Sequence, residues 1–224
     1  MDVLILAAGR GARMRPLTDR TPKPLLRVGG ESLIARLVGQ LAAAGLRRLV
    51  VNHAHLGEQI VQALGDGGRW GVRIRYSDES GGALETGGGI CQALPWLESD
   101  PFLVVNGDLY TDYPFGDSAL AAGDLARLVL VDNPPHHPGG DFHLAGDRLV
   151  PPPSDAPRLT FAGIGLYRHE LFQDCPRGRA FPLAPLLRRA VAAGRAGGEH
   201  YRGLWEDVGT PARLAELNRR LAGA

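Results

Sequence analysis

Lys23 is the residue whose type and place in this chain point most directly to chemistry. It is the only lysine, although lysine and arginine together number 25. A chain that uses arginine almost everywhere keeps a lysine where a compact ammonium on a flexible stem is needed, unless that lysine has survived by chance. Its position favours a function, because a glycine- and arginine-rich segment, Gly9–Pro16, precedes it and Pro22 and Pro24 flank it.

The glycine-rich segment follows the first apolar run of the chain and contains Gly9, Gly11, Arg13 and Arg15. A dinucleotide-binding loop would have a third glycine where Met14 stands, and a helix would begin directly after it to bind the pyrophosphate. A Walker loop would continue with Gly-Lys-Ser or Gly-Lys-Thr, which does not follow here. What remains is a long loop of exposed N–H groups and cationic side chains, which is suited to binding a polyphosphate.

Strands and helices alternate along the hydrophobicity pattern. Strands are predicted at 3–6, 49–51, 72–76, 102–105, 126–131, 141–150 and 160–167. Helices are predicted at 31–44, 56–64, 85–94, 115–124, 183–193 and 211–221. The alternation predicts an α/β fold with a doubly wound, mostly parallel Rossmann-like sheet, in a single domain over residues 1–224. Ligands bind at the carboxyl ends of strands in such sheets, so we expect Gly9, Gly11 and Asn106–Asp108 at one site.

The N-terminal loop resembles the signature of the sugar-1-phosphate nucleotidyltransferases. The matching residues are Leu6-Ala7-Ala8-Gly9-x-Gly11-x-Arg13-x-x-Pro16-Leu17-Thr18, followed by Pro22-Lys23-Pro24. Asn106-Gly107-Asp108 resembles the metal-binding strand end of this family, and Trp205-x-Asp207-Val208-Gly209-Thr210 resembles the segment of its second metal carboxylate. The resemblance covers the whole chain. It implies a nucleotidyltransferase fold and a Mg²⁺-dependent enzyme, with Asp108 and Asp207 as metal ligands.

Three further segments narrow the resemblance: Asp132–His137, Gly140–Phe142 and Glu199–Gly203. They resemble the uridylyltransferases of peptidoglycan (cell-wall) recycling. The resemblance implies UTP and N-acetylmuramate α-1-phosphate as substrates, with UDP-N-acetylmuramate and pyrophosphate as products. A mannose-1-phosphate guanylyltransferase or a cytidylyltransferase is an alternative within the family. A non-catalytic nucleotide-sugar sensor is an alternative of another class, but a sensor would not need residues for metal and pyrophosphate.

The resemblance also implies which residues form the site. The catalytic set is Arg13, Lys23, Asp108 and Asp207. The nucleotide is expected to contact Ala7, Ala8, Gly9, Gly11, Arg13, Lys23, Glu79, Gly87 and Asn106. The sugar phosphate is expected to contact Glu85, Asn106, Asp141, Gly163 and Arg202.

The chemistry of such a reaction gives these residues their roles. A sugar 1-phosphate is largely a dianion at neutral pH, so it can attack without a general base. The enzyme must align it with the α-phosphorus and neutralise charge as pyrophosphate leaves. Mg²⁺ prefers carboxylate and phosphate oxygens, although either aspartate taken singly could form a turn or cap a helix. We expect Arg13 to bind the β- and γ-phosphates and Lys23 the α-phosphate, whereas Arg15 equally suits a salt bridge.

Two glutamates depart from the family pattern. Glu79 stands where many members have a glutamine that reads the base. A carboxylate can accept from uracil N3–H but cannot donate to O4, and it could equally accept from guanine. Glu85 begins a Glu-Thr-Gly sequence where Gly-Thr-Ala or Gly-Thr-Gly is more common. Its side chain could equally bind sugar hydroxyls or cap the following helix.

Arg202 is our candidate for binding the lactyl carboxylate of N-acetylmuramate, with a surface ion pair as the alternative.

Composition limits the remaining possibilities. The chain has 224 residues and a net charge of +1, which gives no electrostatic reason to expect nucleic acid or a membrane surface as a partner. Cys91 and Cys175 stand apart without a CxxC spacing, so neither a zinc site nor a disulfide framework is indicated. His136 and His137 are expected in a loop near the sugar rather than at a zinc ion. The start of the chain carries no signal-peptide pattern, and we expect a cytoplasmic monomer or weak homodimer.

Overall fold

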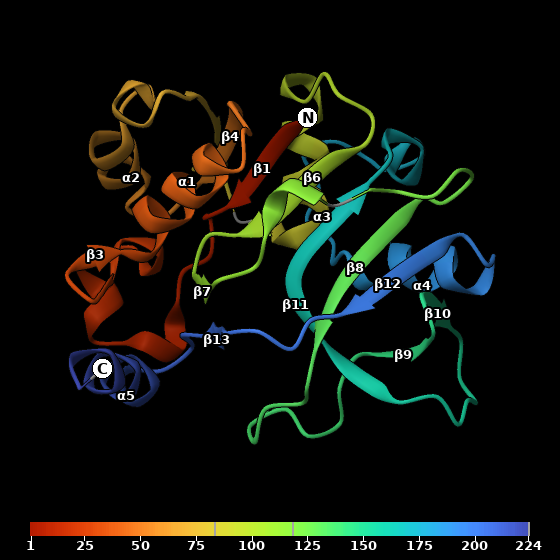
Figure 1. Ribbon diagram of the computed structural model, residues 1–224. Helices are drawn as coiled ribbons and strands as arrows, with labels where there is room; N and C mark the ends of the chain where they lie inside the picture. The colour runs from red at the N-terminus through yellow and green to blue at the C-terminus, as the bar shows by residue number, and fades with distance from the viewer. Residues whose placement is uncertain (83, 118, 224) are drawn as a thin grey trace.

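One nine-stranded sheet runs through the computed structural model, which describes residues 1–82, 84–117 and 119–223 (Figure 1). The strands lie in the order β5-β4-β1-β6-β11-β8-β12-β10-β9. Their bounds are β1 Asp2–Leu6, β4 Arg48–His53, β5 Arg73–Asp78, β6 Phe102–Asn106, β8 Ala126–Val131, β9 Phe142–Ala145, β10 Arg148–Val150, β11 Arg158–Tyr167 and β12 Ala196–His200. Two short antiparallel pairs lie outside this sheet, β2 (Arg27–Val28) with β3 (Glu31–Ser32) and β7 (Leu109–Thr111) with β13 (Trp205–Asp207).

The sheet has a parallel half and a mixed half. Strands β5, β4, β1 and β6 all run parallel, as the sequence predicts. Beyond them, β11 runs antiparallel to both β6 and β8, and β10 runs antiparallel to both β12 and β9. The prediction of a mostly parallel sheet therefore holds for the first half, whereas in the second half only β8 and β12 pair in parallel. One reason is the β9–β10 hairpin, in which Gly146 takes φ +61° in a two-residue connection that reverses the chain.

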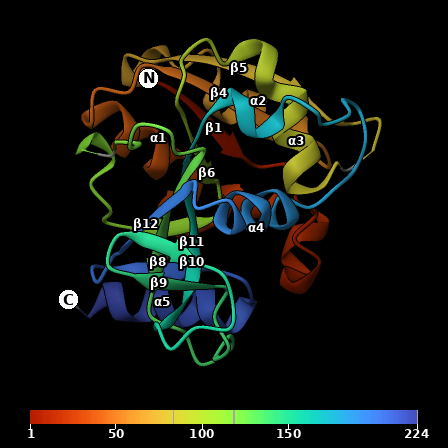
Figure 2. The same ribbon diagram turned by 90° about the vertical axis from the view of Figure 1, so that its right-hand side faces the viewer.

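Helices cover both faces of the sheet, as a doubly wound fold requires (Figures 1 and 2). Val3 and Ile5 of β1 lie in the core cluster of α1 (Leu33–Ala43) and α2 (Gly57–Leu64), whereas Leu4 lies in the cluster of α3 and α4. The bounds of the other helices are α3 Glu85–Ala93, α4 Ala184–Ala192 and α5 Pro211–Ala222. All five lie within two residues of prediction at each end. Within the described ranges, no helix is long and apolar enough to span a membrane.

The predicted helix at 115–124 is wrong. Residue 118 lies outside the described residues; of the others, Phe115–Asp117 form a 3₁₀ turn and 119–125 form neither helix nor strand. Two glycines, Gly116 and Gly123, weaken a helix in this stretch, and Gly123 takes φ +82°. Asp124 is buried at the end of this segment, where Arg148 donates two hydrogen bonds of 2.6 and 2.9 Å to its carboxylate. That ion pair fixes the loop to β10 in place of a helix.

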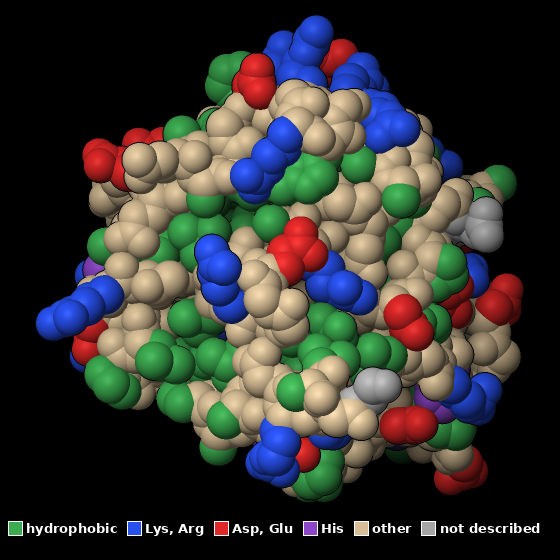
Figure 3. Space-filling view, turned by 60° about the vertical axis from the view of Figure 1, so that its left-hand side comes forward, with side chains coloured by type: hydrophobic (Ala, Val, Ile, Leu, Met, Phe, Trp, Pro, Cys, Tyr) green, Lys and Arg blue, Asp and Glu red, His purple; other side chains and the backbone are tan. Residues whose placement is uncertain are grey.

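Charged side chains of both signs are spread over the face of the molecule in Figure 3. Several basic ones gather at the upper rim of the view, and others lie in the centre and along the left, right and lower edges, with acidic ones among them. The mixture is what a net charge of +1 leads us to expect.

Gly163 lets the mixed half of the sheet approach the end of β6. The pairing of β11 with β8 shifts register between Phe161 and Gly165, and Gly163 lies in this bulge with φ +75°. A Cβ atom at Gly163 would overlap the side-chain amide of Asn106. Both the backbone conformation and the close approach therefore require glycine here.

We expect Gly163→Ala to lower the free energy of unfolding by about 2–5 kcal/mol, because it adds steric overlap to the cost of a left-handed residue. Gly194→Ala is the matched control, since Gly194 has φ +68° and no atom lies within 4 Å of the place that an added Cβ would take. The control should lose about 1 kcal/mol. Urea denaturation of both variants measures the difference, and equal losses would show that Asn106 simply moves aside.

Candidate active site

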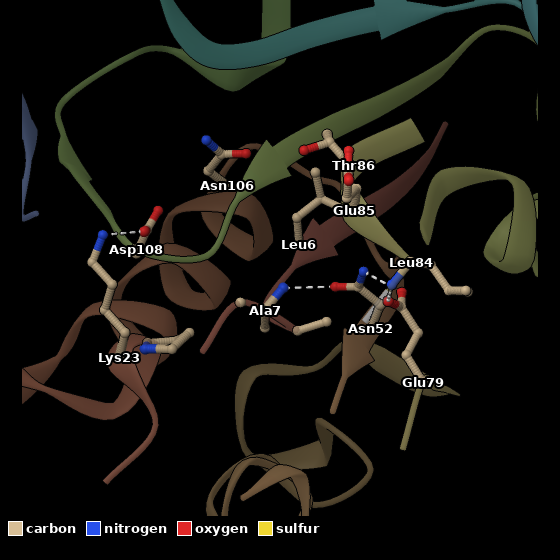
Figure 4. A pocket seen from close by; sticks show the side chains of 13 residues that line it. Leu6, Ala7, Lys23, Asn52, Glu79, Leu84, Glu85, Thr86, Asn106 and Asp108 are labelled. Atoms are coloured by element: carbon tan, nitrogen blue, oxygen red, sulfur yellow. Dashed lines mark hydrogen bonds and ion pairs between the residues drawn. The ribbon is translucent and has the colours of Figure 1, made fainter. Parts of the chain in front are cut away.

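A cleft of about 270 Å³ opens at the carboxyl ends of β1, β4 and β6 (Figure 4). It is lined by Leu6, Ala7, Ala8, Gly9, Lys23, Pro24, Asn52, Glu79, Leu84, Glu85, Thr86, Asn106 and Asp108. Figure 4 shows the Lys23–Asp108 pair at one end and the Asn52–Glu79 pair at the other, with Leu6 and Ala7 between them. The structure thus brings together the N-terminal loop and the end of β6, although Lys23 and Asp108 are 85 positions apart in the chain.

A second hollow of about 330 Å³ adjoins the first. It is lined by Arg13, Lys23, Asn106, Asp108, Leu109, His136, His137, Thr160, Phe161, Ala162, Trp205 and Asp207. Three residues, Lys23, Asn106 and Asp108, belong to both hollows. Two ligands, one in each hollow, would therefore meet at these three side chains.

The N-terminal loop folds back on itself to deliver Lys23. Gly11 takes φ +61°, and the Thr18 hydroxyl donates a 2.8 Å hydrogen bond to its carbonyl oxygen. A Cβ at Gly11 would lie 2.9 Å from Thr18 Cγ2 and 3.1 Å from Lys23 Cβ, so only glycine leaves room for this fold. The spacing of Gly11, Thr18 and Lys23 in the sequence is explained by these contacts.

Lys23 lies between the two aspartates. Its Nζ donates a short hydrogen bond to Asp108 Oδ2 and lies 3.6 Å from Asp207 Oδ1. The pairing of β13 with β7 places Asp207 opposite Leu109, the residue that directly follows Asp108. The two carboxylates therefore lie close together although they are distant in sequence. Each carboxylate is about a quarter exposed, at 25% and 24%. Lys23 therefore lies between two like charges that face the second hollow.

The two carboxylates suit Mg²⁺. Among the residues that the structure describes, no three His, Cys, Asp or Glu side chains lie together in a way that could hold a metal. Mg²⁺ does not need such a cage, because it commonly binds one or two carboxylates and completes its shell with water and substrate phosphates. Asp108 and Asp207 supply that donor set close to the junction of the two hollows.

Asn52 and Glu79 form the far wall of the first cleft. The N–H of Ala7 donates a 2.6 Å hydrogen bond to Asn52 Oδ1, and Asn52 Nδ2 donates a 2.7 Å hydrogen bond to Glu79 Oε1. Burial raises the pKa of the Glu79 carboxyl, and the hydrogen bonds from Asn52 and the N–H of Leu84 offset part of that rise. Sequence analysis assigned no role to Asn52, although it pairs with Leu6 at the same level of the parallel sheet.

The first turn of α3 lines the cleft with Glu85 and Thr86. Glu85 takes φ +57°, a conformation that non-glycine residues adopt rarely. The next glycine does not face the cleft: the N–H of Gly87 donates a 3.0 Å hydrogen bond to the carbonyl of Phe181, and a Cβ there would overlap the Phe181 ring. The structure therefore places Gly87 against the segment before α4, away from the other expected nucleotide contacts.

The residues expected to contact the sugar phosphate do not all line one hollow: Asn106 lines both hollows and Glu85 the first cleft, whereas Asp141, Gly163 and Arg202 line neither. Asp141 accepts a 2.8 Å hydrogen bond from the N–H of Phe161 and lies 3.0 Å from His137 Nε2. It therefore contacts two residues that line the second hollow without lining the hollow itself. Arg202 lies in the loop before β13. It lines a third hollow of about 250 Å³ together with His136 and Asp207.

The two arginines of the N-terminal loop differ in their surroundings. Arg13 lines the second hollow near His136 and makes no ion pair among the described residues. Arg15 is exposed and pairs with Asp19, its Nε lying 3.1 Å from the carboxylate. The salt-bridge alternative is therefore the correct one for Arg15.

Arg213 is a site residue that sequence analysis missed. Its Nη1 lies 3.4 Å from Asp207 Oδ2 and 2.6 Å from His136 Nε2. Burial and the neighbouring Arg213 lower the pKa of His136. Gly209 makes this possible, because a Cβ there would overlap the guanidinium. No spacing rule identifies Arg213. It reaches the site because α5 begins soon after β13, with Thr210 as its N-cap residue accepting a hydrogen bond from the Arg213 N–H.

The chain is similar to nucleotidyltransferases in both sequence and fold. The sequence model of the nucleotidyl transferase family matches residues 2–142. An N-acetylmuramate alpha-1-phosphate uridylyltransferase of Neisseria meningitidis is 52% identical over 100% of this chain and 99% of the relative. A protein of the same name from Caulobacter vibrioides is 35% identical over 99% of this chain and 97% of the relative. An inositol-1-phosphate CTP transferase from T. maritima has the same fold, with a TM-score of 0.75 at 21% identity over 98% of this chain and 95% of that one.

We expect Glu79→Gln to change how stability depends on pH. A carboxyl whose pKa is raised on folding stabilises the protein below its unfolded pKa, and this contribution is lost as the pH rises through the folded pKa. The variant has no such loss, so its free energy of unfolding relative to the wild type should increase from about pH 4 upward. Urea denaturation across pH measures this, with Glu31→Gln at an exposed position as the control. If the difference in free energy of unfolding between variant and wild type does not change with pH, folding does not raise the pKa of Glu79.

Proposed function

We propose a reaction for this chain from one premise: the chain belongs to the nucleotidyl transferase family. The proposed reaction joins UTP and N-acetylmuramate α-1-phosphate to give UDP-N-acetylmuramate and pyrophosphate, in peptidoglycan recycling. The observation that carries the proposal is 52% identity along the whole chain with a relative named for this activity. The arrangement of the two hollows supports it, since they meet at Lys23, Asn106 and Asp108.

The nucleotide takes the first cleft and the sugar phosphate the second. A phosphate oxygen of the sugar attacks the α-phosphorus of UTP, the bond to the β-phosphate breaks, and pyrophosphate leaves with that bond's electron pair. Lys23 is within reach of both hollows, so it is suited to neutralise the α-phosphate as charge develops there. Arg13 lines the edge of the second hollow, so the β- and γ-phosphates would extend past Lys23 out of the first cleft to reach it. Gly9 leaves the loop backbone accessible, with nothing within 4 Å of its Cβ position.

Mg²⁺ is the proposed cofactor, held by Asp108 and Asp207. When bound, it would neutralise phosphate charge and hold the phosphates in line for attack. The chain's own part is to position the two carboxylates, through the turn after β6 and the pairing of β13 with β7. Arg213 contacts one oxygen of Asp207, and Lys23 lies beside the other.

Glu79 and Asn52 are the proposed base-reading residues. Glu79 has two carboxylate oxygens at the far end of the first cleft, where they can accept from uracil N3–H. The same oxygens can accept from N1–H and N2–H₂ of guanine, so GTP is the second candidate nucleotide. Asn52 keeps Glu79 in place through its 2.7 Å hydrogen bond.

The domain organisation, the cellular location and the oligomeric state of the enzyme are also part of the proposal. We infer that residues 1–224 form one nucleotidyltransferase domain, because a single sheet includes residues from Asp2 to His200. UTP is a metabolite of the cytoplasm, which is where we expect the protein. We expect a monomer or weak homodimer that binds neither nucleic acid nor membrane.

A pyrophosphate-release screen tests the proposed function. Four nucleoside triphosphates are each combined with N-acetylmuramate 1-phosphate, N-acetylglucosamine 1-phosphate, glucose 1-phosphate and mannose 1-phosphate. UTP with N-acetylmuramate 1-phosphate should give the highest kcat/KM. Highest turnover with GTP and mannose 1-phosphate would favour the guanylyltransferase, and binding without any pyrophosphate release would favour the sensor.

Lys23→Ala should lower kcat/KM by about two to three decades, the size of loss seen when one preorganised charge donor is removed. Lys23→Arg should also be poor, because a planar guanidinium does not fit the place of a compact ammonium between two carboxylates. Steady-state kinetics on both variants measure this. Full activity of the arginine variant would contradict the argument from the solitary lysine.

Arg202→Ala should discriminate between sugars. The lactyl ether of N-acetylmuramate carries a carboxylate, and a charge-assisted contact with Arg202 should contribute about 1.5–3 kcal/mol. We therefore expect a loss of about ten- to a hundredfold in kcat/KM with N-acetylmuramate 1-phosphate and a much smaller one with N-acetylglucosamine 1-phosphate. Equal losses on the two sugars would place Arg202 outside the lactyl pocket.

A further inference from the structure

The proposed metal position of this site already holds a cation. Lys23 Nζ donates a hydrogen bond to Asp108 Oδ2 and lies 3.6 Å from Asp207 Oδ1. Arg213 Nη1 lies 3.4 Å from the other oxygen of Asp207. Two cations therefore balance the two carboxylates, and Lys23 is only 8% exposed, so little water screens it.

A divalent cation between these carboxylates would meet that positive charge. Mg²⁺ binds carboxylate oxygens at about 2.0–2.1 Å, so an ammonium that kept its hydrogen bond to Asp108 would remain within a few ångströms of the metal. The repulsion between a double and a single charge is twice that between two single charges at the same separation. The ammonium must therefore withdraw before the metal can bind tightly.

We propose that Lys23 occupies the cation position between Asp108 and Asp207 in the substrate-free protein and leaves it only when a nucleoside triphosphate arrives. The triphosphate brings several negative charges into the hollow that Lys23 also lines, and these give the ammonium a new partner. Metal and nucleotide then bind together, each raising the affinity of the other by the same factor. This inference rests on the metal role proposed above.

The solitary lysine fits this exchange better than an arginine would. An ammonium on a four-carbon stem makes single hydrogen bonds and can turn from a carboxylate to a phosphate, whereas a guanidinium holds a carboxylate with two parallel bonds. Asp207 has a guanidinium beside it in Arg213, on its other oxygen. Arg213 is not among the described residues that line the two adjoining hollows, so it can stay in place while Lys23 moves.

The wild-type protein can report the exchange directly, because its only lysine gives one side-chain resonance. Protein labelled with [ζ-¹⁵N]lysine is titrated with Mg²⁺ alone, with UTP alone, and with both. Mg²⁺ alone should leave the Lys23 resonance in place, and Mg²⁺ with UTP should shift it. A resonance that moves fully with Mg²⁺ alone, or that does not move with both, would overturn the proposal.

Variants test the same point through metal affinity. Lys23→Met removes the charge and keeps most of the stem, and Lys23→Arg keeps the charge as the matched control. Mn²⁺ binding to the nucleotide-free proteins, followed by the EPR signal of free Mn²⁺, should be about tenfold tighter or more for Lys23→Met than for the wild type and no tighter for Lys23→Arg. Equal or weaker binding by Lys23→Met contradicts the proposal.

A double variant shows where the ion binds. Lys23→Met combined with Asp108→Asn should lose the added Mn²⁺ affinity, and retention of that affinity would place the ion elsewhere and overturn the proposal. None of these binding measurements contains a sugar phosphate. Failure of the pyrophosphate screen would therefore remove the proposed substrate and leave the exchange standing, whereas failure of the Mn²⁺ and lysine measurements would remove the exchange and leave the substrate.

Discussion

The contact of Lys23 with Asp108 and Asp207 is the interaction on which the rest of the site depends. Removing one partner from a buried ion pair typically costs about 3–5 kcal/mol, and carboxylates a quarter exposed place the cost here at the lower end. The surrounding structure serves to assemble this contact. The Gly11–Thr18 fold delivers the lysine, and the pairing of β13 with β7 brings the second carboxylate to the first.

The same contact explains why two substrates can meet. Lys23 and Asp108 line both hollows, so the charge that holds the free site together lies where the α-phosphorus and the sugar phosphate must approach. Asn52 and Glu79 close the far end of the first cleft, and Asp141 supports a wall of the second hollow through the N–H of Phe161. In the proposed arrangement, the uracil and the N-acetylmuramate would therefore lie apart while the phosphates of the two substrates converge.

Sequence patterns found the parts of this arrangement that depend on local periodicity or on a long motif. The first strand, the five helices and the Gly9–Lys23 loop follow from such patterns, and so does the meeting of that loop with Asp108. The mixed half of the sheet did not, because the direction in which β11 pairs with β6 and β8 depends on contacts between segments distant in sequence. The position of Arg213 in the site and the orientation of Gly87 could not be predicted either, because each depends on contacts between segments distant in sequence.

The central claim is that this cleft holds a metal between Asp108 and Asp207, with a nucleotide on one side and a sugar on the other. A crystal structure of the protein with Mn²⁺ and UDP-N-acetylmuramate, measured with anomalous diffraction, tests it most directly. We expect one anomalous peak between the two carboxylates, the uracil beside Glu79 and the sugar beside Phe161 and Trp205. Mn²⁺ at another place, or a nucleotide outside the cleft that Lys23 and Asn52 line, would contradict the account.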